Sequence, residues 1–174
     1  MSAWDDDTAQ NYADSYGDDP SIFEVLAAAM IEDGSDVIDI GCGSGPALAA
    51  MARTAGRLAG VDPTPRMIEI ARARCPEADL RVAPGEATGF DGMSFDVVTI
   101  INVIHHFDDI GAGLAEAYRL LRPGGRVVIG GEVFGTDMLP EGQDYSGGLE
   151  AAGFSGVTHR DLSGAFLVTA RKEE

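Results

Sequence analysis

The stretch VIDIGCGSGP, at residues 37–46, joins an apolar strand to a glycine loop and the start of a helix. Val37, Ile38 and Ile40 form a β-branched run, which is typical of strands. The glycines allow positive φ angles and a close approach of a ligand to the backbone. Pro46 suits the first turn of a helix, where an N–H has no partner within the helix. Such a loop after a parallel strand is where doubly wound α/β proteins bind nucleotide-like ligands.

The spacing of the glycines separates two kinds of nucleotide site. Dinucleotide-binding loops follow the pattern G-x-G-x-x-G/A, and Pro46 stands where that pattern needs its third small residue. Gly41, Gly43 and Gly45 give G-x-G-x-G instead. Asp39, two residues before the loop, favours a ligand with an ammonium or sulfonium group over a pyrophosphate. A nicotinamide-dependent reductase is therefore the weaker alternative, and it predicts nicotinamide binding.

A second carboxylate, Asp62, ends the next apolar run, 23 residues after Asp39. A carboxylate at this point can accept hydrogen bonds from both hydroxyls of a ribose. Hydrogen bonds to a charged group contribute about 1.5–3 kcal/mol each. The alternative role for Asp62 is to cap the helix that follows, which Thr64 could also do.

The remaining pattern predicts alternating helices and strands, and hence an α/β fold. The expected strands are at residues 36–40, 57–61, 80–83, 95–101 and 126–129, and the expected helices are at 19–34, after Gly45, at 65–74, 110–121 and 148–152. The nearly continuous apolar run at 95–101 indicates a strand that is buried on both faces. Two β runs, at 157–162 and 165–170, predict an antiparallel hairpin at the edge of the sheet.

The composition excludes several classes of protein. A net charge of −17 with a single lysine disfavours nucleic acid and anionic membrane surfaces as partners. No apolar run approaches the roughly 20 residues of a transmembrane helix, and the first residues lack the pattern of a signal peptide. The two cysteines have no metal-ligand spacing, so we expect no metal and a reducing, cytoplasmic environment.

Five ordered motifs resemble those of the class I S-adenosylmethionine-dependent methyltransferases, in particular the small-molecule branch called methyltransferase type 11. They are VIDIGCGSG (37–45), GVDPTPRM (60–67), GEA (85–87), FDVVTIINVIHHF (95–107) and LRPGG (121–125). The resemblance spans residues 10–171. It implies a Rossmann-like, doubly wound, seven-stranded and mostly parallel sheet with a C-terminal antiparallel hairpin. It also implies an N-terminal helical segment at 1–34 that belongs to the same domain as a methyltransferase core at 35–174.

The resemblance implies S-adenosyl-L-methionine as the cofactor and assigns a set of residues to its site. Asp62 would bind the ribose, Met67 and Glu86 the adenine, and Asp39 either the loop amides or, through water, the methionine amino group. Met67 could instead be a core residue and Asp39 a turn-stabilising one. The remaining candidates for cofactor contacts are Tyr16, Gly41, Cys42, Gly43, Gly45, Pro63, Ala87 and Asn102. We interpret Cys42 as a small buried filler and not as a nucleophile.

The pair His105-His106 follows the fourth strand, near the expected position of the reacting methyl group. His105 is the candidate catalytic residue because a histidine can act as a general base at neutral pH. The alternative is that both histidines only shape the loop. Tyr12 resembles family tyrosines over the methionine end of the cofactor. Trp4 could add an aromatic wall or belong to a frayed terminus.

The acceptor region is short in comparison with the family, because only residues 135–147 separate the fifth strand from the last helix. The acceptor site is then either shallow and open, or closed by the N-terminal segment or by a second subunit. We expect a neutral or cationic small-molecule acceptor, and a monomer or a homodimer. The alternative function is a non-catalytic S-adenosylmethionine-binding protein that regulates a partner.

Overall fold

The computed structural model of the chain describes residues 2–16, 27–28, 30–132, 145–162 and 165–174. The strands are β1 (Asp36–Ile40), β2 (Arg57–Asp62), β3 (Asp79–Val82), β4 (Phe95–Ile101), β5 (Leu121–Glu132), β6 (Ser155–Leu162) and β7 (Ala165–Arg171). The helices are α1 (Asp6–Tyr16), α3 (Pro46–Met51), α4 (Pro65–Arg74), α5 (Ile110–Leu120) and α6 (Ser146–Ala151), with a short 3-10 helix η1 (Ile104–His106) after β4.

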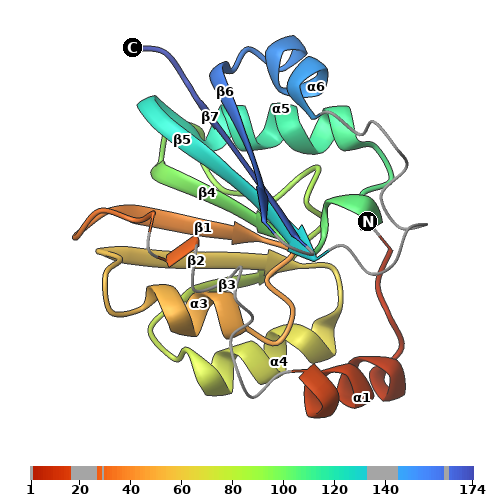
Figure 1. Cartoon of the computed structure of the whole chain (residues 1–174). Coiled ribbons are helices and arrows are strands. Elements are labelled where there is room, and N and C mark those ends of the chain that lie inside the picture. Colours follow the sequence, from red (N-terminus) through yellow and green to blue (C-terminus); the bar gives the residue numbers. More distant parts are fainter. Residues whose placement is uncertain (1, 17–26, 29, 133–144, 163–164) are drawn as a thin grey trace.

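The strands form a seven-stranded sheet in the order β3-β2-β1-β4-β5-β7-β6 (Figure 1). The pairs from β3 through β5 are parallel, whereas β7 is antiparallel to both β5 and β6. This is the doubly wound, mostly parallel sheet with a C-terminal antiparallel hairpin that the sequence predicts. The chain order reverses direction across the sheet between β1 and β4, and such a switch point opens a crevice at the carboxyl ends of the strands.

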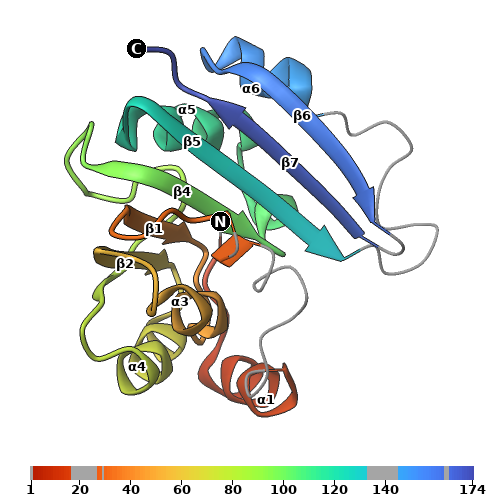
Figure 2. The same ribbon diagram turned by 60° about the vertical axis from the view of Figure 1, so that its left-hand side comes forward.

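Helices cover both faces of the sheet, as two views of the ribbon show (Figure 1, Figure 2). On one face α3 and α4 supply Leu48, Met51 and Ile68 to a buried apolar cluster. On the other face α5 and α6 supply Leu114 and Leu149 to a second, larger cluster. The sheet is therefore the middle layer of three.

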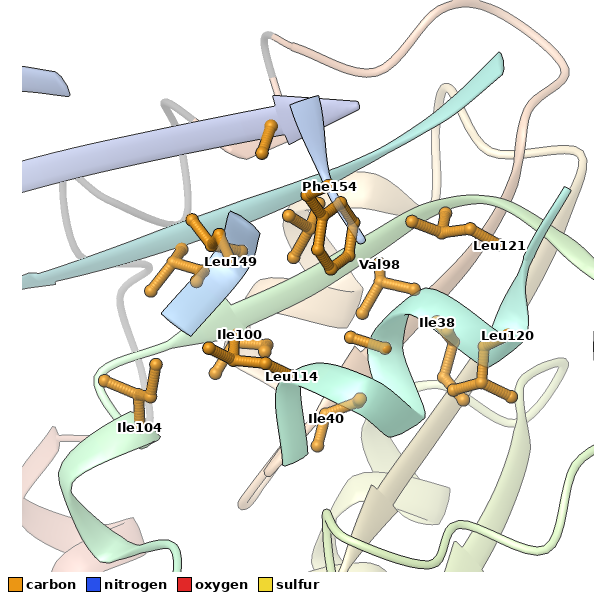
Figure 3. Close-up of a cluster of buried hydrophobic side chains, with 14 of the residues drawn as sticks. Ile38, Ile40, Val98, Ile100, Ile104, Leu114, Leu120, Leu121, Leu149 and Phe154 are labelled. Atoms are coloured by element: carbon orange, nitrogen blue, oxygen red, sulfur yellow. The ribbon is translucent and has the colours of Figure 1, made fainter. Parts of the chain in front are cut away.

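Successive residues of β4 enter the two clusters alternately. Val98 and Ile100 belong to the cluster beneath α5 and α6, where Figure 3 shows them beside Leu114. Val97 and Ile101 belong to the cluster beneath α3 and α4. The apolar run is buried on both faces, as its composition predicts. Each buried side chain of this size contributes about 1.5–3 kcal/mol relative to full exposure.

Several predicted boundaries are wrong, and the clearest case is the end of the helix expected at 110–121. The apolar spacing extends the helix at 110–121 through Leu121 and starts the next strand at 126. In the structure α5 ends at Leu120, and Leu121 is already extended (φ −71°, ψ 140°) and pairs with Phe95. Leu120, in the helix, and Leu121, in the strand, are both fully buried, so apolar character could not show where the helix ends.

The N-terminal region contains a helix that the pattern did not predict separately. Asp5 caps α1, because its Oδ1 accepts a hydrogen bond from the Thr8 backbone N–H at 2.8 Å. Arg66 of α4 donates from Nε and Nη2 to Gln10 Oε1 at 3.1 and 2.7 Å, so α1 lies against α4. The helix expected at 19–34 falls largely outside the described residues, and of it the structure describes residues 27–28 as helical.

The region expected to carry the acceptor site, 135–147, lies outside the described residues up to 144. The helix expected at 148–152 begins two residues earlier, as α6. Among the described residues, no helix is long and apolar enough to span a membrane. The same residues contain no group of three or more His, Cys, Asp or Glu side chains that could hold a metal ion.

Candidate cofactor site

The glycine loop follows β1 at the carboxyl edge of the sheet, as predicted. Gly41, Gly43 and Gly45 all have positive φ, at 77°, 51° and 88°. A Cβ on Gly41 would lie 2.5 Å from a methyl group of Val103, whereas a Cβ on Gly43 would meet nothing within 4 Å. Glycine at 41 therefore permits the contact with Val103. At Gly43 the backbone faces open space, which leaves room for a ligand to approach it.

Asp62, at the end of β2, joins this loop to the start of α4. Its Oδ2 accepts a hydrogen bond from the Gly43 backbone N–H at 3.1 Å, and its Oδ1 accepts one from the Thr64 N–H at 2.8 Å. Burial raises the pKa of Asp62, while these hydrogen bonds and the charge of His106 oppose the rise. A carboxylate has about four acceptor positions, and these two bonds use one on each oxygen.

Asp39 lies beneath the loop in β1 and is 2% exposed. Its Oδ1 accepts a hydrogen bond from Thr99 Oγ1, across the β1–β4 pair, at 2.6 Å. The amide groups of Gly41 and Cys42 donate instead to the Val61 carbonyl, at 2.8 and 2.9 Å. The partner of these two loop amides is therefore Val61, whereas Asp39 accepts its hydrogen bond from the neighbouring strand β4.

Three further candidates surround the loop. Cys42 is buried, and burial, together with the charges of Asp39 and Asp62, raises the pKa of its thiol well above the usual range. A protonated, buried thiol is a poor nucleophile, in agreement with a filler role. Pro63 is half-buried beside Asp62. Met67, on α4, is only 2% exposed, so an adenine ring could reach it only after some rearrangement.

Glu86 and Ala87 follow β3 and already make contacts within the protein. Glu86 Oε1 accepts a hydrogen bond from the Asp108 backbone N–H at 2.8 Å. The Ala87 N–H donates to the Pro84 carbonyl at 3.2 Å. Glu86 thus ties the segment after β3 to the one after β4. An adenine contact at Ala87 would have to replace or share the bond within the turn.

The segment after β4 brings Asn102 and the two histidines to the same edge. Asn102 has a positive φ of 56°, and its N–H donates to the Gly130 carbonyl at 2.8 Å. Both histidines are exposed on η1, with ring centroids 4.1 Å apart. Desolvation and the neighbouring His106 lower the pKa of His105. Tyr16 ends α1, and its side chain lies outside the part of the chain that the structure describes.

The sequence analysis did not predict two hydrogen-bonding roles in this region, that of Thr99 and that of the Thr64 hydroxyl. Thr99 interrupts an otherwise apolar run in β4, and a hydroxyl at a position buried on both faces needs a hydrogen-bond partner. That interruption was a usable signal. The Thr64 hydroxyl accepts a hydrogen bond from the Trp4 backbone N–H at 3.1 Å, and nothing in the local sequence indicates a partner 60 residues away.

A separate cavity of about 390 Å³ opens at the opposite, amino edge of the sheet. Its charged lining residues include Glu32, Asp96, Arg126 and Arg171. Arg126 and Glu32 already form an ion pair at 3.3 Å. None of the candidate residues lines this cavity.

The fold defines a doubly wound α/β protein in which the glycine loop and Asp62 meet at the carboxyl edge, where such sheets bind ligands. The family model described as "Methyltransferase domain" matches residues 38–129, more than half of the chain. The chain belongs to the class I S-adenosylmethionine-dependent methyltransferases, an enzyme family whose cofactor is S-adenosylmethionine.

Two curated relatives and one solved structure illustrate the relationship. The ubiquinone biosynthesis O-methyltransferase of Methylobacterium sp. (strain 4-46) is 31% identical over 182 residues, covering 86% of this chain and 71% of that protein. The demethylmenaquinone methyltransferase of Tropheryma whipplei (strain Twist) is 35% identical over 99 residues, covering 55% of this chain. A TehB-like SAM-dependent methyltransferase from Corynebacterium glutamicum shares the fold, with a TM-score of 0.80 and 22% identity over 97% of this chain and 100% of that one.

The match to the Tropheryma enzyme spans 41% of that relative's length. The rest of that relative is unmatched.

Proposed function

We propose that this chain transfers the methyl group of S-adenosylmethionine to a small-molecule acceptor through an O, N, C or S nucleophile and releases S-adenosylhomocysteine. The observation that carries the proposal is the joint position of the glycine loop and Asp62. The Gly43 N–H donates a hydrogen bond to the Asp62 carboxylate. The two residues lie at the ends of two neighbouring parallel strands.

The residues present fit an adenosyl cofactor. Asp62 has acceptor positions beyond those that Gly43 and Thr64 use, and ribose hydroxyls are suitable donors for them. The open space at Gly43 allows a ligand to approach the loop backbone. Asp39 adds a negative charge beneath the loop, which suits a cofactor that carries an ammonium and a sulfonium group.

When bound, the cofactor supplies an electrophilic methyl group, and the chain holds the acceptor in line with it. We assign the proton transfer to His105, whose imidazole is exposed at the carboxyl edge. An alcohol or amine acceptor needs this base, because its attacking atom must lose a proton. A phenol or carboxylate acceptor is already partly or fully ionised and does not need it.

The acceptor proposal follows from charge and from the names of the relatives. A protein with a net charge of −17 favours a neutral or cationic acceptor over a phosphorylated one. The two relatives are named for ubiquinone biosynthesis and for demethylmenaquinone, so ring compounds of quinone biosynthesis are the first acceptors to screen.

Calorimetric titration tests the cofactor part of the proposal. We expect S-adenosylmethionine and S-adenosylhomocysteine to bind and NADH not to bind. Asp62→Ala should weaken binding at least tenfold, because each ribose hydrogen bond to the carboxylate contributes about 1.5–3 kcal/mol. Asp33→Ala removes the same charge from an exposed residue at the opposite edge and should leave binding unchanged.

A folded protein that binds neither compound would contradict the proposal. Binding without methyl transfer to any acceptor of a broad panel would favour the alternative, a non-catalytic S-adenosylmethionine-binding protein that regulates a partner. The short segment at 135–147 is the observation that keeps this alternative open.

A further inference from the structure

Trp4 bridges two loops that flank the end of β1. Its backbone N–H donates to Thr64 Oγ1, just after β2, at 3.1 Å. Its indole meets the ring of His106, just after β4, edge-on, with centroids 6.0 Å apart and an interplanar angle of 87°. Because β1 lies between β2 and β4 in the sheet, Trp4 connects the two segments that follow the neighbours of β1.

Trp4 contacts the segments beside the point where the strand order reverses. Ligands of doubly wound sheets bind outside the carboxyl ends of the strands, where the chain order reverses. Here that point lies between β1 and β4. Figure 1 shows the N-terminal segment leaving α1 and ending beside these strand ends, and Figure 2 shows the same arrangement from another side.

Contacts from several elements hold the segment in this place. The Tyr12 ring, on α1, packs against the Trp4 indole with centroids 5.2 Å apart. Asp5 begins α1 with hydrogen bonds from Thr8, and Arg66 of α4 holds Gln10 of α1. Trp4 is half-buried as a result. These contacts are too numerous for a frayed terminus, which was one of the two expectations for Trp4.

We propose that Trp4 forms the outer wall of the cofactor crevice and that its indole moves when the cofactor enters. The inference rests on the proposed function, since it concerns the same crevice. Asp62 and Thr64 are 7% and 3% exposed while Trp4 is bonded to Thr64, so a ribose reaches Asp62 only if a covering group shifts. The indole then packs on the bound adenosine, as aromatic side chains do on bases.

The contacts of Trp4 with Thr64, Tyr12 and His106 accordingly control how fast the cofactor exchanges. A protein whose binding-competent form is only partly populated binds more slowly in proportion to that fraction. Removing the indole populates the open form and also removes the wall that retains the bound cofactor. Both the association and the dissociation rate constants then rise.

The chain contains a single tryptophan, so its emission reports on Trp4 alone. We expect the emission, excited at the red edge of the indole band, to change saturably as S-adenosylhomocysteine is added, with the same Kd that calorimetry gives. In Trp4→Ala, surface-immobilised protein should bind and release S-adenosylhomocysteine at least fivefold faster than wild type. Trp4→Phe keeps an aromatic wall and should stay within twofold of wild type. Thermal unfolding of both variants shows whether the fold is retained.

Binding seen by calorimetry without any change in Trp4 emission would overturn the inference and leave the proposed function standing. Equal rate constants in Trp4→Ala and wild type would do the same. An absence of binding by calorimetry would overturn both proposals. If Trp4→Ala fails to fold, the emission titration of the wild-type protein still decides the question.

Discussion

Thr99 and Asp39 face each other across the β1–β4 pair, and both are almost completely buried. A buried carboxylate is costly unless hydrogen bonds stabilise it. The 2.6 Å bond from the Thr99 hydroxyl is one such bond, and it fixes the carboxylate on the side of β1 that faces β4. We expect Thr99 to act on the glycine loop through Asp39, which lies two residues before Gly41.

Thr99→Val should lower stability by about 1–3 kcal/mol, because it removes a hydrogen bond to a buried charge while keeping the shape of the side chain. It should also weaken S-adenosylhomocysteine binding, whereas Thr99→Ser restores the hydroxyl and most of the affinity. Chemical denaturation and calorimetry give the two readouts. Thr158→Val removes a hydroxyl that bonds to Thr169 in the exposed β6–β7 pair, and it serves as the control. Equal affinity in Thr99→Val and wild type would refute the link to the loop.

His105 should work as a base below neutral pH. Desolvation and the nearby His106 lower its pKa from 6.5, so the neutral imidazole persists as the pH falls through 6.5. With an alcohol or amine acceptor, the acid limb of the kcat–pH profile should therefore lie below pH 6.5. His105→Gln should reduce kcat by about 10²–10⁴-fold. His106→Gln is the matched control for the loss of a neighbouring imidazole.

His105 is not the base if His105→Gln keeps the acid limb of the kcat–pH profile. The same conclusion follows if His105→Gln leaves kcat unchanged. Cofactor affinity measured beside kcat separates a base from a binding residue.

Individual site residues differ in how far the sequence predicts them. The sequence places Asp62 next to the glycine loop because parallel strands end at one edge. It does not indicate the bond from Asp39 to Thr99, which depends on the register between strands 60 residues apart. Nor does it indicate that Trp4 reaches Thr64. Long-range contacts of this kind arise from tertiary packing, which local patterns do not encode.

At the scale of elements, the glycine loop combines two different requirements. Gly41 must lack a side chain because Val103 of the segment after β4 packs against it. Gly43 needs only its left-handed backbone, since the space around it is open. The first glycine thus serves the packing of the loop on the sheet, and we propose that the second serves the approach of the ligand.

Alanine substitutions should separate these requirements. Gly41→Ala should destabilise the protein by roughly 3 kcal/mol or more, because a positive φ costs about 1–2 kcal/mol and the overlap with Val103 adds to it. Gly43→Ala should cost only about 1–2 kcal/mol, yet weaken cofactor binding more than its stability loss explains. Gly34→Ala, at φ 83° with nothing within 4 Å, measures the backbone cost alone. Denaturant unfolding and calorimetry supply the values, and equal losses at Gly41 and Gly34 would contradict the packing argument.

Element types could be predicted more reliably than element boundaries. The apolar run of β4 and the glycine loop before α3 were both recognised from pattern. The end of α5 was not, because the helical Leu120 and the extended Leu121 are both buried in the same cluster. The change from helix to strand there depends on the pairing of Leu121 with Phe95, a tertiary interaction.

On the scale of the whole molecule, acidity is the dominant electrostatic property. The sequence has 29 acidic and 12 basic side chains. Several arginines of the described residues are already engaged in ion pairs, including Arg57, Arg66, Arg119 and Arg122. The acidic side chains outnumber the basic ones, and their mutual repulsion opposes the compact state.

Salt should stabilise this protein. Raising NaCl from about 20 mM to 500 mM shortens the range of the repulsion well below 10 Å. We expect Tm to rise by roughly 2–4 °C, the change that corresponds to about 1 kcal/mol for a chain of this size. The increase should shrink near pH 4, where carboxylates become neutral. A fall in Tm with salt would mean that the surface ion pairs outweigh the repulsion.

The fold as a whole followed from the sequence because its motifs occur in order along nearly the entire chain. The acceptor did not follow. Class I methyltransferases share the cofactor edge of the sheet, while acceptor specificity resides in segments that vary, so the fold cannot supply it.

The place of β7 between β5 and β6 has a consequence for synthesis on the ribosome. β6 has β7 as its neighbour in the sheet, and β5 needs β7 to complete its outer edge. As the chain emerges, β1 to β5 can pair in turn, but β6 must wait for a strand that is made after it. Until then β5 exposes an unpaired edge, which is a template for aggregation. The final strand therefore closes the sheet, and nascent chains that stall before β7 are those most in need of a chaperone.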